Sequence, residues 1–216
     1  MAGLLNLVIA TTNEGKVKEL RALLGDLPLT LLTVGAVLGE RLHVNEDGTT
    51  FDHNAIVKAR AVCQATKLYA LADDSGLEVD GLDGRPGVRS ARFAHERATD
   101  AENNAALLRE LDEVTGEGRR ARFRCVLALA SPWAPEHVET VAGSCEGYIA
   151  RAPRGSGGFG YDPLFIVSEL GERAMAELGD DEKNAVSHRA RAVRALRPVL
   201  LALIDERLRE VERTLG

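Results

Sequence analysis

Two adjacent carboxylates, Asp73 and Asp74, follow an apolar stretch in the segment LADDSG and could hold a metal ion. Ligands of open α/β sheets bind at the carboxyl ends of strands, which is where this pair is predicted to lie. Neighbouring carboxylates repel each other, so the pair needs a cation or a raised pKa. Magnesium meets that need because it prefers carboxylate and phosphate oxygens. The alternative is an Asx turn or a helix cap without a chemical role.

A second segment, IATTNEGK, places polar residues at a predicted turn from strand to helix. Backbone N–H groups at a helix start, together with hydroxyl groups and a lysine, form an anion site. The segment is not a Walker A loop, because it lacks the first glycine and the Ser/Thr after the lysine. The alternative is a capped surface helix with a solvated lysine. The predicted anion site consists of Thr11, Thr12, Asn13 and Lys16.

A glycine-rich segment, GSGGFG (155–160), matches the G-x-G-x-x-G fingerprint of dinucleotide-binding enzymes. That fingerprint requires a helix directly after the glycines. Here Pro163 and an apolar, β-branched run follow, and they predict a strand. We therefore interpret the match as accidental. What remains is a flexible loop that carries an exposed aromatic ring, Phe159, and an acid, Asp162.

A basic segment, KNAVSHR, places Lys183, His188 and Arg189 within seven residues, with Ser187 as a predicted helix cap. These donors suit phosphates or the edge of a base, and the alternative is a solvated basic face. Glu46, after a predicted strand, is a further acid whose alternative is a solvated loop position. The sequence has no Ser/His/Asp order and no nucleophile elbow, so covalent catalysis has no candidate. Carboxylates, cations and an aromatic ring together indicate metal-assisted hydrolysis of a nucleotide.

The elements that would position these groups follow from hydrophobic periodicity. Strands are predicted at 4–10, 29–34, near 42–45, and at 69–72, 121–130, 137–143, 145–150 and 164–167. Helices are predicted after Asn13, from an Asp52 cap to about Thr66, from a Thr99/Glu102 capping box to about Val114, and over the C-terminal part. Residues 35–50 otherwise read as a loop, and Pro198 either kinks the last helix or begins a new one. This order predicts an α/β fold with a mixed sheet.

Composition limits the classes of protein and partner. The 216 residues are 45% hydrophobic and 28% charged, an ordinary globular balance, and the net charge of −6 argues against a nucleic-acid-binding surface. Three separated cysteines without a C-x-x-C argue against zinc or a disulfide framework and favour a reducing cytoplasm. The first residues do not have the pattern of a signal peptide, and no apolar run approaches the ~20 residues of a membrane span. Trp133, alone in a Pro-rich loop, is expected to be partly packed.

Five segments resemble, in order, the inosine triphosphate pyrophosphatase family, also called Ham1-like. They are ATTNEGKVKEL, TTFDHNAIVKA, LADDSGLEVDGLDGRPGVRSARF, GGFGYDPLF and KNAVSHRARA, and they span about residues 8–195. The resemblance implies one domain over residues 1–216, with an elongated mixed α/β fold of two lobes around a central cleft, assembled as a homodimer. It also implies Mg²⁺-dependent hydrolysis of XTP, ITP and dITP to the monophosphate and pyrophosphate. The implied partner is a purine nucleoside triphosphate in the cytoplasm, with neither nucleic acid nor membrane.

The same resemblance implies roles for individual residues. Asp74 would be the general base, and Asp74 and Glu46 would hold the metal. Phe159 would stack on the purine, with Asp162 near the base or sugar. Further contacts to the substrate are implied for Thr11 to Lys16 and Lys58 at the phosphates, for Ser75, for Gly160 and Tyr161 beside Phe159, and for Lys183, His188 and Arg189 at the base and neighbouring polar groups.

Three residues depart from the family's pattern. Thr12 stands where a glycine is frequent, so the loop here is expected to avoid a positive φ. His53 stands where a glutamate is common, which puts in doubt the contacts that would hold the metal ligands in place. Arg89 replaces a common tyrosine at a turn, where it can face solvent. Two rival functions are a broader nucleotide phosphohydrolase and a nucleotide-binding sensor without catalysis, and the presence of Asp74, Glu46 and Lys16 argues against the sensor.

Overall fold

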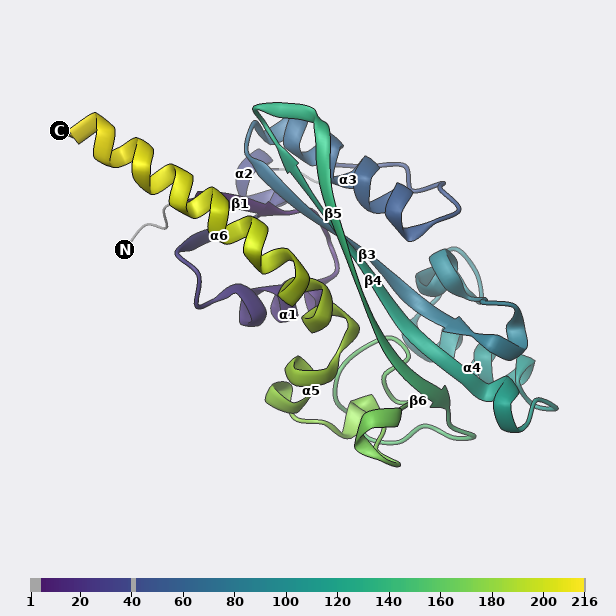
Figure 1. The fold of residues 1–216 in the computed structure, drawn as a ribbon. Helices are drawn as coiled ribbons and strands as arrows, with labels where there is room; N and C mark the ends of the chain where they lie inside the picture. Colours follow the sequence, from purple (N-terminus) through teal and green to yellow (C-terminus); the bar gives the residue numbers. More distant parts are fainter. Residues whose placement is uncertain (1–4, 40–41, 216) are drawn as a thin grey trace. The chain divides into compact units, whose positions relative to one another are not determined.

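A computed structural model describes residues 5–39 and 42–215 of the chain. Its strands are β1 (Leu5–Ile9), β2 (Leu29–Thr33), β3 (Tyr69–Val79), β4 (Arg120–Ser131), β5 (Ala134–Ile149) and β6 (Phe165–Val167). They form a six-stranded sheet in the order β2-β1-β3-β4-β5-β6 (Figure 1). Strand β1 is parallel to β2 and β3, whereas β5 is antiparallel to β6. The predicted α/β fold with a mixed sheet is therefore confirmed; Leu4, the first residue of the first predicted strand, lies outside the described residues.

Most of the helices begin at a residue whose side chain accepts a backbone N–H group of the first turn, and the sequence predicts some of these caps. They are α1 (Glu14–Leu24), α2 (Val34–Leu38), α3 (Phe51–Thr66), α4 (Asp100–Glu110), α5 (Asp180–Val186) and α6 (His188–Leu215). Asn13 caps α1, and Thr99 forms the predicted capping box with Glu102 at α4. At α3 the prediction of an Asp52 cap is wrong, because the Thr50 hydroxyl accepts the backbone N–H of His53 at 3.2 Å. Helix α6 runs through Pro198, so no new helix begins there.

The chain divides into two compact units. The first unit comprises Met1–Asp74, Val126–Ala142 and Ala192–Gly216, and the second comprises Ser75–Cys125 and Gly143–Arg191. Strands β3, β4 and β5 each pass from one unit into the other. In β3 the change falls between Asp74 and Ser75, so these sequence neighbours belong to different units.

The core of the first unit includes the centre of its parallel strands. Leu7, Val8 and Ile9 of β1 are fully buried, as expected for a strand with neighbours on both edges and cover on both faces. Leu20 and Leu24 of α1 are also fully buried, four positions apart on one helix face. This burial fixes both sides of the β1–α1 turn, which carries the predicted anion site.

The core of the second unit holds the chain on either side of the glycine-rich segment. Leu107 and Leu111 belong to the same buried cluster as Tyr161, Leu164 and Phe165. All five side chains are less than 5% exposed. The end of α4 and the residues that follow the glycines therefore share one apolar core, which gives the glycine-rich loop a firm attachment.

A buried arginine closes that core. Arg119 is 7% exposed, and its guanidinium donates to the carbonyl oxygens of Leu111 at 2.6 Å, Val114 at 3.2 Å, Ile149 at 2.8 Å and Ala150 at 2.9 Å. The fork geometry of the guanidinium lets one side chain bond several carbonyl groups at once. Arg119 thus supplies hydrogen-bond donors to carbonyl groups just after α4 and at the end of β5.

Several predicted elements differ from the structure. The helix predicted to about Val114 ends at Glu110, and the region after β6, predicted to be helical, has only two short 3-10 turns before α5. Residues 42–50 contain no strand, so the strand predicted near 42–45 is wrong. Part of the predicted loop 35–50 is helical, because Thr33 caps α2 by accepting the N–H of Ala36 at 3.3 Å. Strand β3 does not end at Ala72 but continues to Val79. The two strands predicted at 137–143 and 145–150 are one strand, β5.

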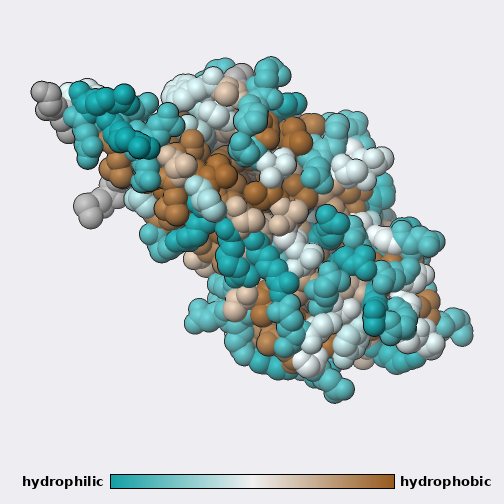
Figure 2. Space-filling model, in the orientation of Figure 1, coloured by the Kyte–Doolittle hydropathy of each residue, from teal (hydrophilic) through white to brown (hydrophobic). Residues whose placement is uncertain are grey.

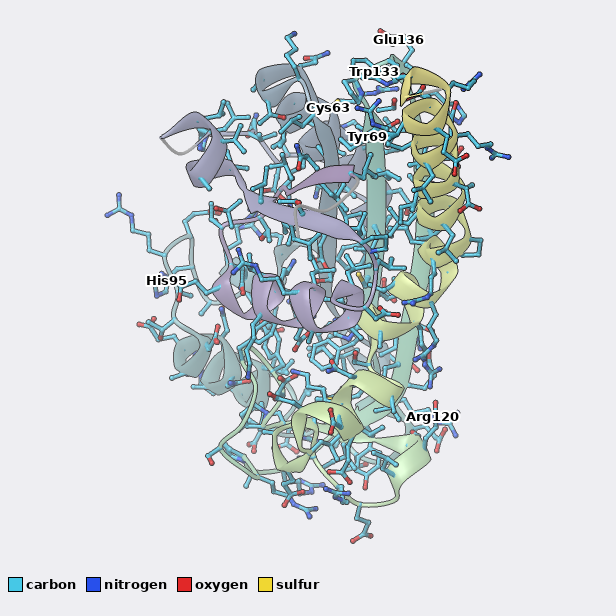
Figure 3. The ribbon with its side chains drawn as sticks, turned by 90° about the vertical axis from the view of Figure 1, so that its left-hand side faces the viewer. Cys63, Tyr69, His95, Arg120, Trp133 and Glu136 are labelled. Carbon is cyan, nitrogen blue, oxygen red and sulfur yellow. The ribbon has the colours of Figure 1, made fainter. Side chains whose placement is uncertain are left out.

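Apolar side chains on the surface lie mainly at two places of the first unit. Figure 2 shows brown surface along α6, where Leu201 is 43% and Leu208 37% exposed. Trp133 lies with Glu136 at the β4–β5 turn (Figure 3) and is 80% exposed, so the expectation that it is partly packed is wrong. Among the described residues, no helix combines the length and the apolar character that a membrane span requires.

Candidate functional site

The turn between β1 and α1 is held by its own polar side chains. Asn13 accepts the N–H of Lys16 at 3.1 Å through Oδ1, and its own N–H donates to Thr11 Oγ1 at 3.2 Å. Thr12 is exposed. Its φ is not positive, as the sequence predicted. The turn therefore presents the start of an 11-residue helix with its hydroxyl groups, the arrangement that attracts anions.

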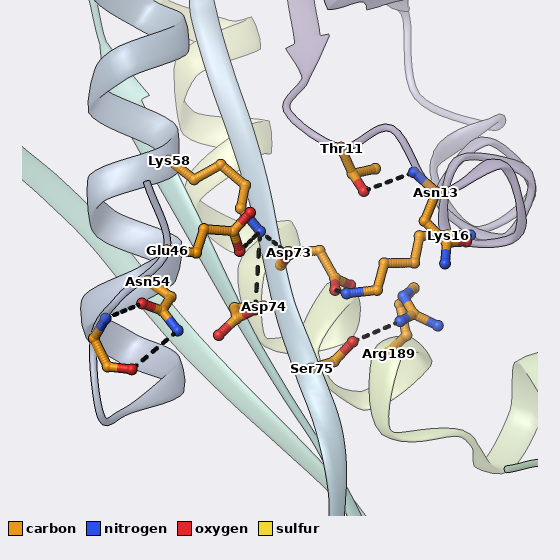
Figure 4. Close-up of polar contacts among 11 residues, drawn as sticks. Thr11, Asn13, Lys16, Glu46, Asn54, Lys58, Asp73, Asp74, Ser75 and Arg189 are labelled. Carbon is orange, nitrogen blue, oxygen red and sulfur yellow. Dashed lines mark hydrogen bonds and ion pairs between the residues drawn. The ribbon is translucent and has the colours of Figure 1, made fainter. Parts of the chain in front are cut away.

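Lys16 extends from this turn to a buried carboxylate on β3. Its Nζ lies 2.7 Å from Asp73 Oδ1, and the Asp73 side chain is fully buried (Figure 4). A fully buried carboxylate needs a partner charge, and Lys16 supplies one. Asp73 thus fixes the position of the lysine ammonium, a role that the sequence did not assign to it.

On β3, Asp74 meets a second lysine. Successive strand residues point to opposite faces, so Asp73 and Asp74 face different surroundings. Lys58 Nζ lies 2.6 Å from Glu46 Oε2 and 3.8 Å from Asp74 Oδ1, and it donates to the Asp73 carbonyl at 3.2 Å (Figure 4). The structure thus brings together Glu46 and Asp74, the two carboxylates that the family resemblance assigned to a metal. Both carboxylates lie near the same cation, the Lys58 ammonium group.

The carboxyl group of Asp74 has an unusual acidity. Burial raises its pKa from 3.8 to about 6, and the nearby Lys58 and Lys16 ammonium groups only partly oppose this. Its Oδ2 atom is buried and accepts no hydrogen bond within the part of the chain that the structure describes. A carboxylate of this pKa accepts protons near neutral pH, as a general base must.

Asn54 of α3 supports the loop that carries Glu46. Its Oδ1 accepts the N–H of Gly48 at 2.9 Å, and its Nδ2 donates to the Gly48 carbonyl at 3.5 Å. A Cβ at Gly48 would lie 2.5 Å from Asn54 Oδ1, so only glycine allows this approach. Asn54 was missed by sequence reasoning, although it lies inside the segment TTFDHNAIVKA. His53 is an exposed residue of the first turn of α3.

A magnesium ion would fit the carboxylates of the first unit. The described residues contain no group of three or more His, Cys, Asp or Glu side chains that could hold a metal. Magnesium, however, is usually bound through one or two carboxylates, water and substrate phosphates, and does not need a full protein cage. Glu46 and the Oδ2 of Asp74, which accepts no hydrogen bond from the described residues, match that requirement.

In the second unit, the residues predicted to bind the base surround Phe159. Asp162 Oδ2 accepts the N–H of Phe159 at 3.0 Å and the Nζ of Lys183 at 2.5 Å. The Lys183 ammonium lies 4.9 Å, and the Arg189 guanidinium 5.8 Å, from the centre of the Phe159 ring. Phe159 is half-buried, less exposed than the sequence suggested. Arg189 also donates to Ser75 Oγ at 2.9 Å.

The basic segment is buried. Lys183 is 7%, His188 5% and Arg189 1% exposed, so the alternative of a solvated basic face is wrong. The His188 ring stacks on Phe123 with 4.8 Å between ring centroids and 18° between planes. Ser187 caps α6 as predicted, because its hydroxyl accepts the N–H of Ala190 at 3.1 Å. Burying these donors costs hydration, so they are placed for polar partners.

The glycine-rich loop has a backbone that requires glycine. Gly158 and Gly160 have φ of 72° and 61°, and a Cβ at Gly158 would lie 2.0 Å from Asp162 Oδ2. No helix follows, because the chain turns into β6, which confirms that the dinucleotide fingerprint is accidental. Tyr161 is 4% exposed and donates its hydroxyl to the Ser90 carbonyl at 2.8 Å, so its side chain anchors the loop in the core.

Glu14, Arg89 and two histidines lie at the surface. Glu14 is exposed in the first turn of α1. Arg89 faces solvent as expected, with 56% of its side chain exposed and an ion pair to Glu96 at 2.7 Å. His95, labelled in Figure 3, is exposed and lies 3.4 Å from Glu102, and the exposed His137 lies 2.7 Å from Glu139.

Comparison with known proteins shows similarity over nearly the whole chain. The model of the Ham1 family matches residues 7–199. The chain is 53% identical over 191 residues to a dITP/XTP pyrophosphatase of Geobacter sulfurreducens, which covers 88% of this chain and 94% of the relative. It is 48% identical over 195 residues to the dITP/XTP pyrophosphatase of Bacillus subtilis, covering 90% of this chain and 96% of the relative.

Solved structures show the same likeness. A HAM1 protein from Coxiella burnetii matches with a TM-score of 0.82 and 42% identity, over 92% of this chain and 99% of that protein. The Staphylococcus aureus Ham1 protein matches with a TM-score of 0.80 and 36% identity, over 91% of this chain and 98% of that protein. The fold and the order of the segments are thus shared over almost the full length of these proteins.

Proposed function

Because the chain belongs to the Ham1 family, we propose that it hydrolyses non-canonical purine nucleoside triphosphates such as XTP, ITP and dITP to the nucleoside monophosphate and pyrophosphate. The relatives that match it are named dITP/XTP pyrophosphatases and align over almost their whole length. The observation that carries the proposal is the buried Asp74 carboxylate, whose pKa is raised to about 6 and which lies beside Lys58 and Glu46.

In this proposal Asp74 acts as the general base. A water molecule attacks the α-phosphorus while Asp74 takes its proton. The bond from the α-phosphorus to the oxygen that bridges to the β-phosphate breaks, and pyrophosphate leaves. Lys16 and Lys58, held in place by Asp73 and Glu46, are fixed donors for the phosphate oxygens. The start of α1, with Thr11 to Gly15, binds the phosphate chain.

Glu46 and Asp74 would hold Mg²⁺ in this arrangement. Bound there, the ion would neutralise charge on the phosphates and on the departing pyrophosphate. The Oδ2 of Asp74, which accepts no hydrogen bond from the described residues, and the short Lys58–Glu46 contact support the assignment, since both carboxylates lie where a cation is already favoured.

The second unit supplies the residues that we assign to the nucleoside. Phe159 stacks on the purine, with Asp162 near the base or sugar. Lys183, His188 and Arg189 read the base and neighbouring polar groups, Ser75 touches the substrate, and Gly160 and Tyr161 shape the loop. The cations within 6 Å of the Phe159 ring support this, because they place donors beside an aromatic platform. We also propose a cytoplasmic homodimer without a nucleic-acid or membrane partner.

The function is tested by incubating the protein with ITP and Mg²⁺ and separating the products by chromatography. We expect IMP and pyrophosphate in equal amounts. IDP and phosphate would instead support a broader phosphohydrolase. Binding of ITP without turnover would support a nucleotide sensor. Both alternatives contradict the proposed reaction.

The metal assignment predicts that EDTA abolishes activity and that Glu46→Gln raises the Mg²⁺ concentration needed for half-maximal rate. Changes in the outer surroundings of a metal typically cost 10–100-fold in affinity, so loss of a ligand charge should cost at least about tenfold. The measurement is a Mg²⁺ titration of the rate at saturating ITP. Asp47→Asn is the matched control, because Asp47 lies in the same loop and bonds Asn45 at 2.9 Å. If Glu46→Gln and Asp47→Asn titrate alike, Glu46 does not hold the metal.

A further inference from the structure

Gly160, next to Phe159, is bonded through both of its backbone polar groups by one helix. Its N–H donates to Asp100 Oδ2 at 2.7 Å, and its carbonyl accepts Asn104 Nδ2 at 2.9 Å. Asp100 and Asn104 lie four positions apart near the start of α4, so they share one helix face. The helix thus bonds the loop like a two-point clamp, which we call the α4 clamp (Asp100 and Asn104).

The helix that carries the α4 clamp is itself fixed. Thr99 and Glu102 form a reciprocal capping box at its first turn. The next residue, Asn103, is 3% exposed, accepts the N–H of Ala94 at 2.9 Å and donates to the Ala91 carbonyl at 3.1 Å. The orientation of the α4 clamp is therefore set by the fold and not by the loop that it bonds.

The residues on either side of Gly160 are held by further hydrogen bonds. The N–H of Phe159 donates to Asp162, and the hydroxyl of Tyr161 donates to the Ser90 carbonyl. The aromatic side chain of Phe159 has no hydrogen-bonding group, so its position depends on the backbone on either side and on the Lys183 and Arg189 cations over the ring. Gly160 has a φ of 61° and no Cβ, and without external bonds such a residue has wide conformational freedom.

The orientation of the Asn104 side chain leaves one of its polar atoms without a hydrogen bond, which costs stability. Its Nδ2 bonds Gly160, while its Oδ1 is buried and accepts no hydrogen bond within the described part of the chain. A buried unsatisfied oxygen opposes folding, so a residue selected for stability alone would be expected to avoid it. Such a local conflict is typical of positions that serve function.

We propose that Asp100 and Asn104 are positioning residues for purine recognition, which hold Gly160 so that Phe159 is presented to the base before the substrate arrives. The inference rests on the proposed function, because it assumes that Phe159 stacks on a purine. Preorganisation raises affinity by removing the entropy of ordering a loop on binding. Each lost hydrogen bond is expected to weaken nucleoside binding by about three- to tenfold.

The experiment compares Asp100→Ala, Asn104→Ala and Asp100→Asn with Glu113→Ala, an exposed carboxylate just after α4 that serves as control. Calorimetry with Mg²⁺ measures binding of IMP, which carries a base, and of tripolyphosphate, which carries none. Amide hydrogen exchange in the free protein measures the mobility of residues 155–162. Asp100→Asn keeps an oxygen that can accept the Gly160 N–H, so it is expected to behave like the native protein.

The α4 clamp predicts that both alanine variants weaken IMP binding and speed exchange in the loop, while tripolyphosphate binding stays unchanged. Equal weakening of IMP and tripolyphosphate would overturn the proposal, since it would indicate general structural damage. Unchanged loop exchange and unchanged IMP affinity would overturn it as well. Faster loop exchange with unchanged IMP affinity would show that the α4 clamp is a structural contact only, and would overturn its role in purine recognition. The proposed function is tested separately, by the products formed from ITP.

Discussion

The Asp74→Asn variant is expected to lose about 10²- to 10⁴-fold in kcat for ITP, the usual cost of removing a general base. Asparagine has nearly the same shape but cannot take a proton from water. Nucleotide binding should be retained, because Lys16 and the α1 turn do not depend on Asp74. The measurements are kcat by product analysis and ITP affinity by calorimetry. A variant with near-native kcat would exclude Asp74 as the base.

The pKa of Asp74 sharpens this experiment. Without metal this pKa is about 6, and Mg²⁺ bound at Asp74 favours the ionised carboxylate, so the native kcat/KM should rise with pH at a midpoint below 6 when Mg²⁺ is saturating. The unfolded chain releases this proton near its ordinary value, at lower pH. The ionised form therefore destabilises the folded state, beginning above about pH 4 and fully above about pH 6.

Asp74→Asn should consequently be more stable than the native protein at pH 7, by up to about 3 kcal/mol, and equally stable near pH 3. Thermal unfolding at the two pH values measures this. Asp83→Asn provides a control, because Asp83 is exposed and asparagine tolerates its positive φ of 53°. Lost activity with gained stability separates a catalytic role from misfolding. A loss of stability at pH 7 would contradict the role of burial in raising the pKa.

The second large effect concerns the base. We expect a strong preference for 6-oxo purines over adenine, up to roughly 10⁴-fold in kcat/KM, as found for sites built around a polar contact. Hypoxanthine and xanthine present an acceptor at position 6, which suits the buried donors Lys183, His188 and Arg189. Adenine presents an amino group there, and donors facing donors would be left unpaired.

Substitutions can separate this polar contact from stacking. Lys183→Ala or His188→Ala should narrow the ratio of kcat/KM between ITP and ATP, whereas Phe159→Ala should weaken both substrates alike, because every purine has a similar face. His188→Phe is the sharper variant, since it can keep the stacking on Phe123 while it removes the ring nitrogens. The test is kcat/KM for ITP, XTP and ATP at fixed Mg²⁺. Equal values for ITP and ATP in the native protein would defeat the base-reading role of this segment.

The sequence predicts those parts of the fold whose signals are local. Asn13 before an apolar periodicity and the Thr99/Glu102 pair fixed the starts of α1 and α4, because a cap is made by residues within three positions. The strand after the glycine loop followed from Pro163. For the candidate site, the residue types alone pointed to Asp74, whereas the roles of Glu46 and Lys58 came only from the family resemblance. The structure places the three side chains together.

The sequence could not predict features that depend on distant partners. Asp73 and Asp74 looked like the end of a strand, since unpaired carboxylates are disfavoured in one. β3 nevertheless continues, because Lys16 and Lys58 compensate the two charges from other elements. The burial of Arg189 and the carbonyl contacts of Arg119 likewise depend on chain segments far away in sequence. The sequence around Arg119 does not distinguish it from a surface arginine, and the segment KNAVSHR left a solvated face open as the alternative for Arg189.

The exposed position of Trp133 decides which optical signals can follow this protein. It is the single tryptophan of the chain, and it stands 80% exposed at the β4–β5 turn. Indole emission depends on the polarity around the ring, which for Trp133 is already close to that of water. Its fluorescence will therefore change little on denaturation. Circular dichroism, or a tryptophan placed by design in the apolar interior, is the better reporter for the stability measurements described above.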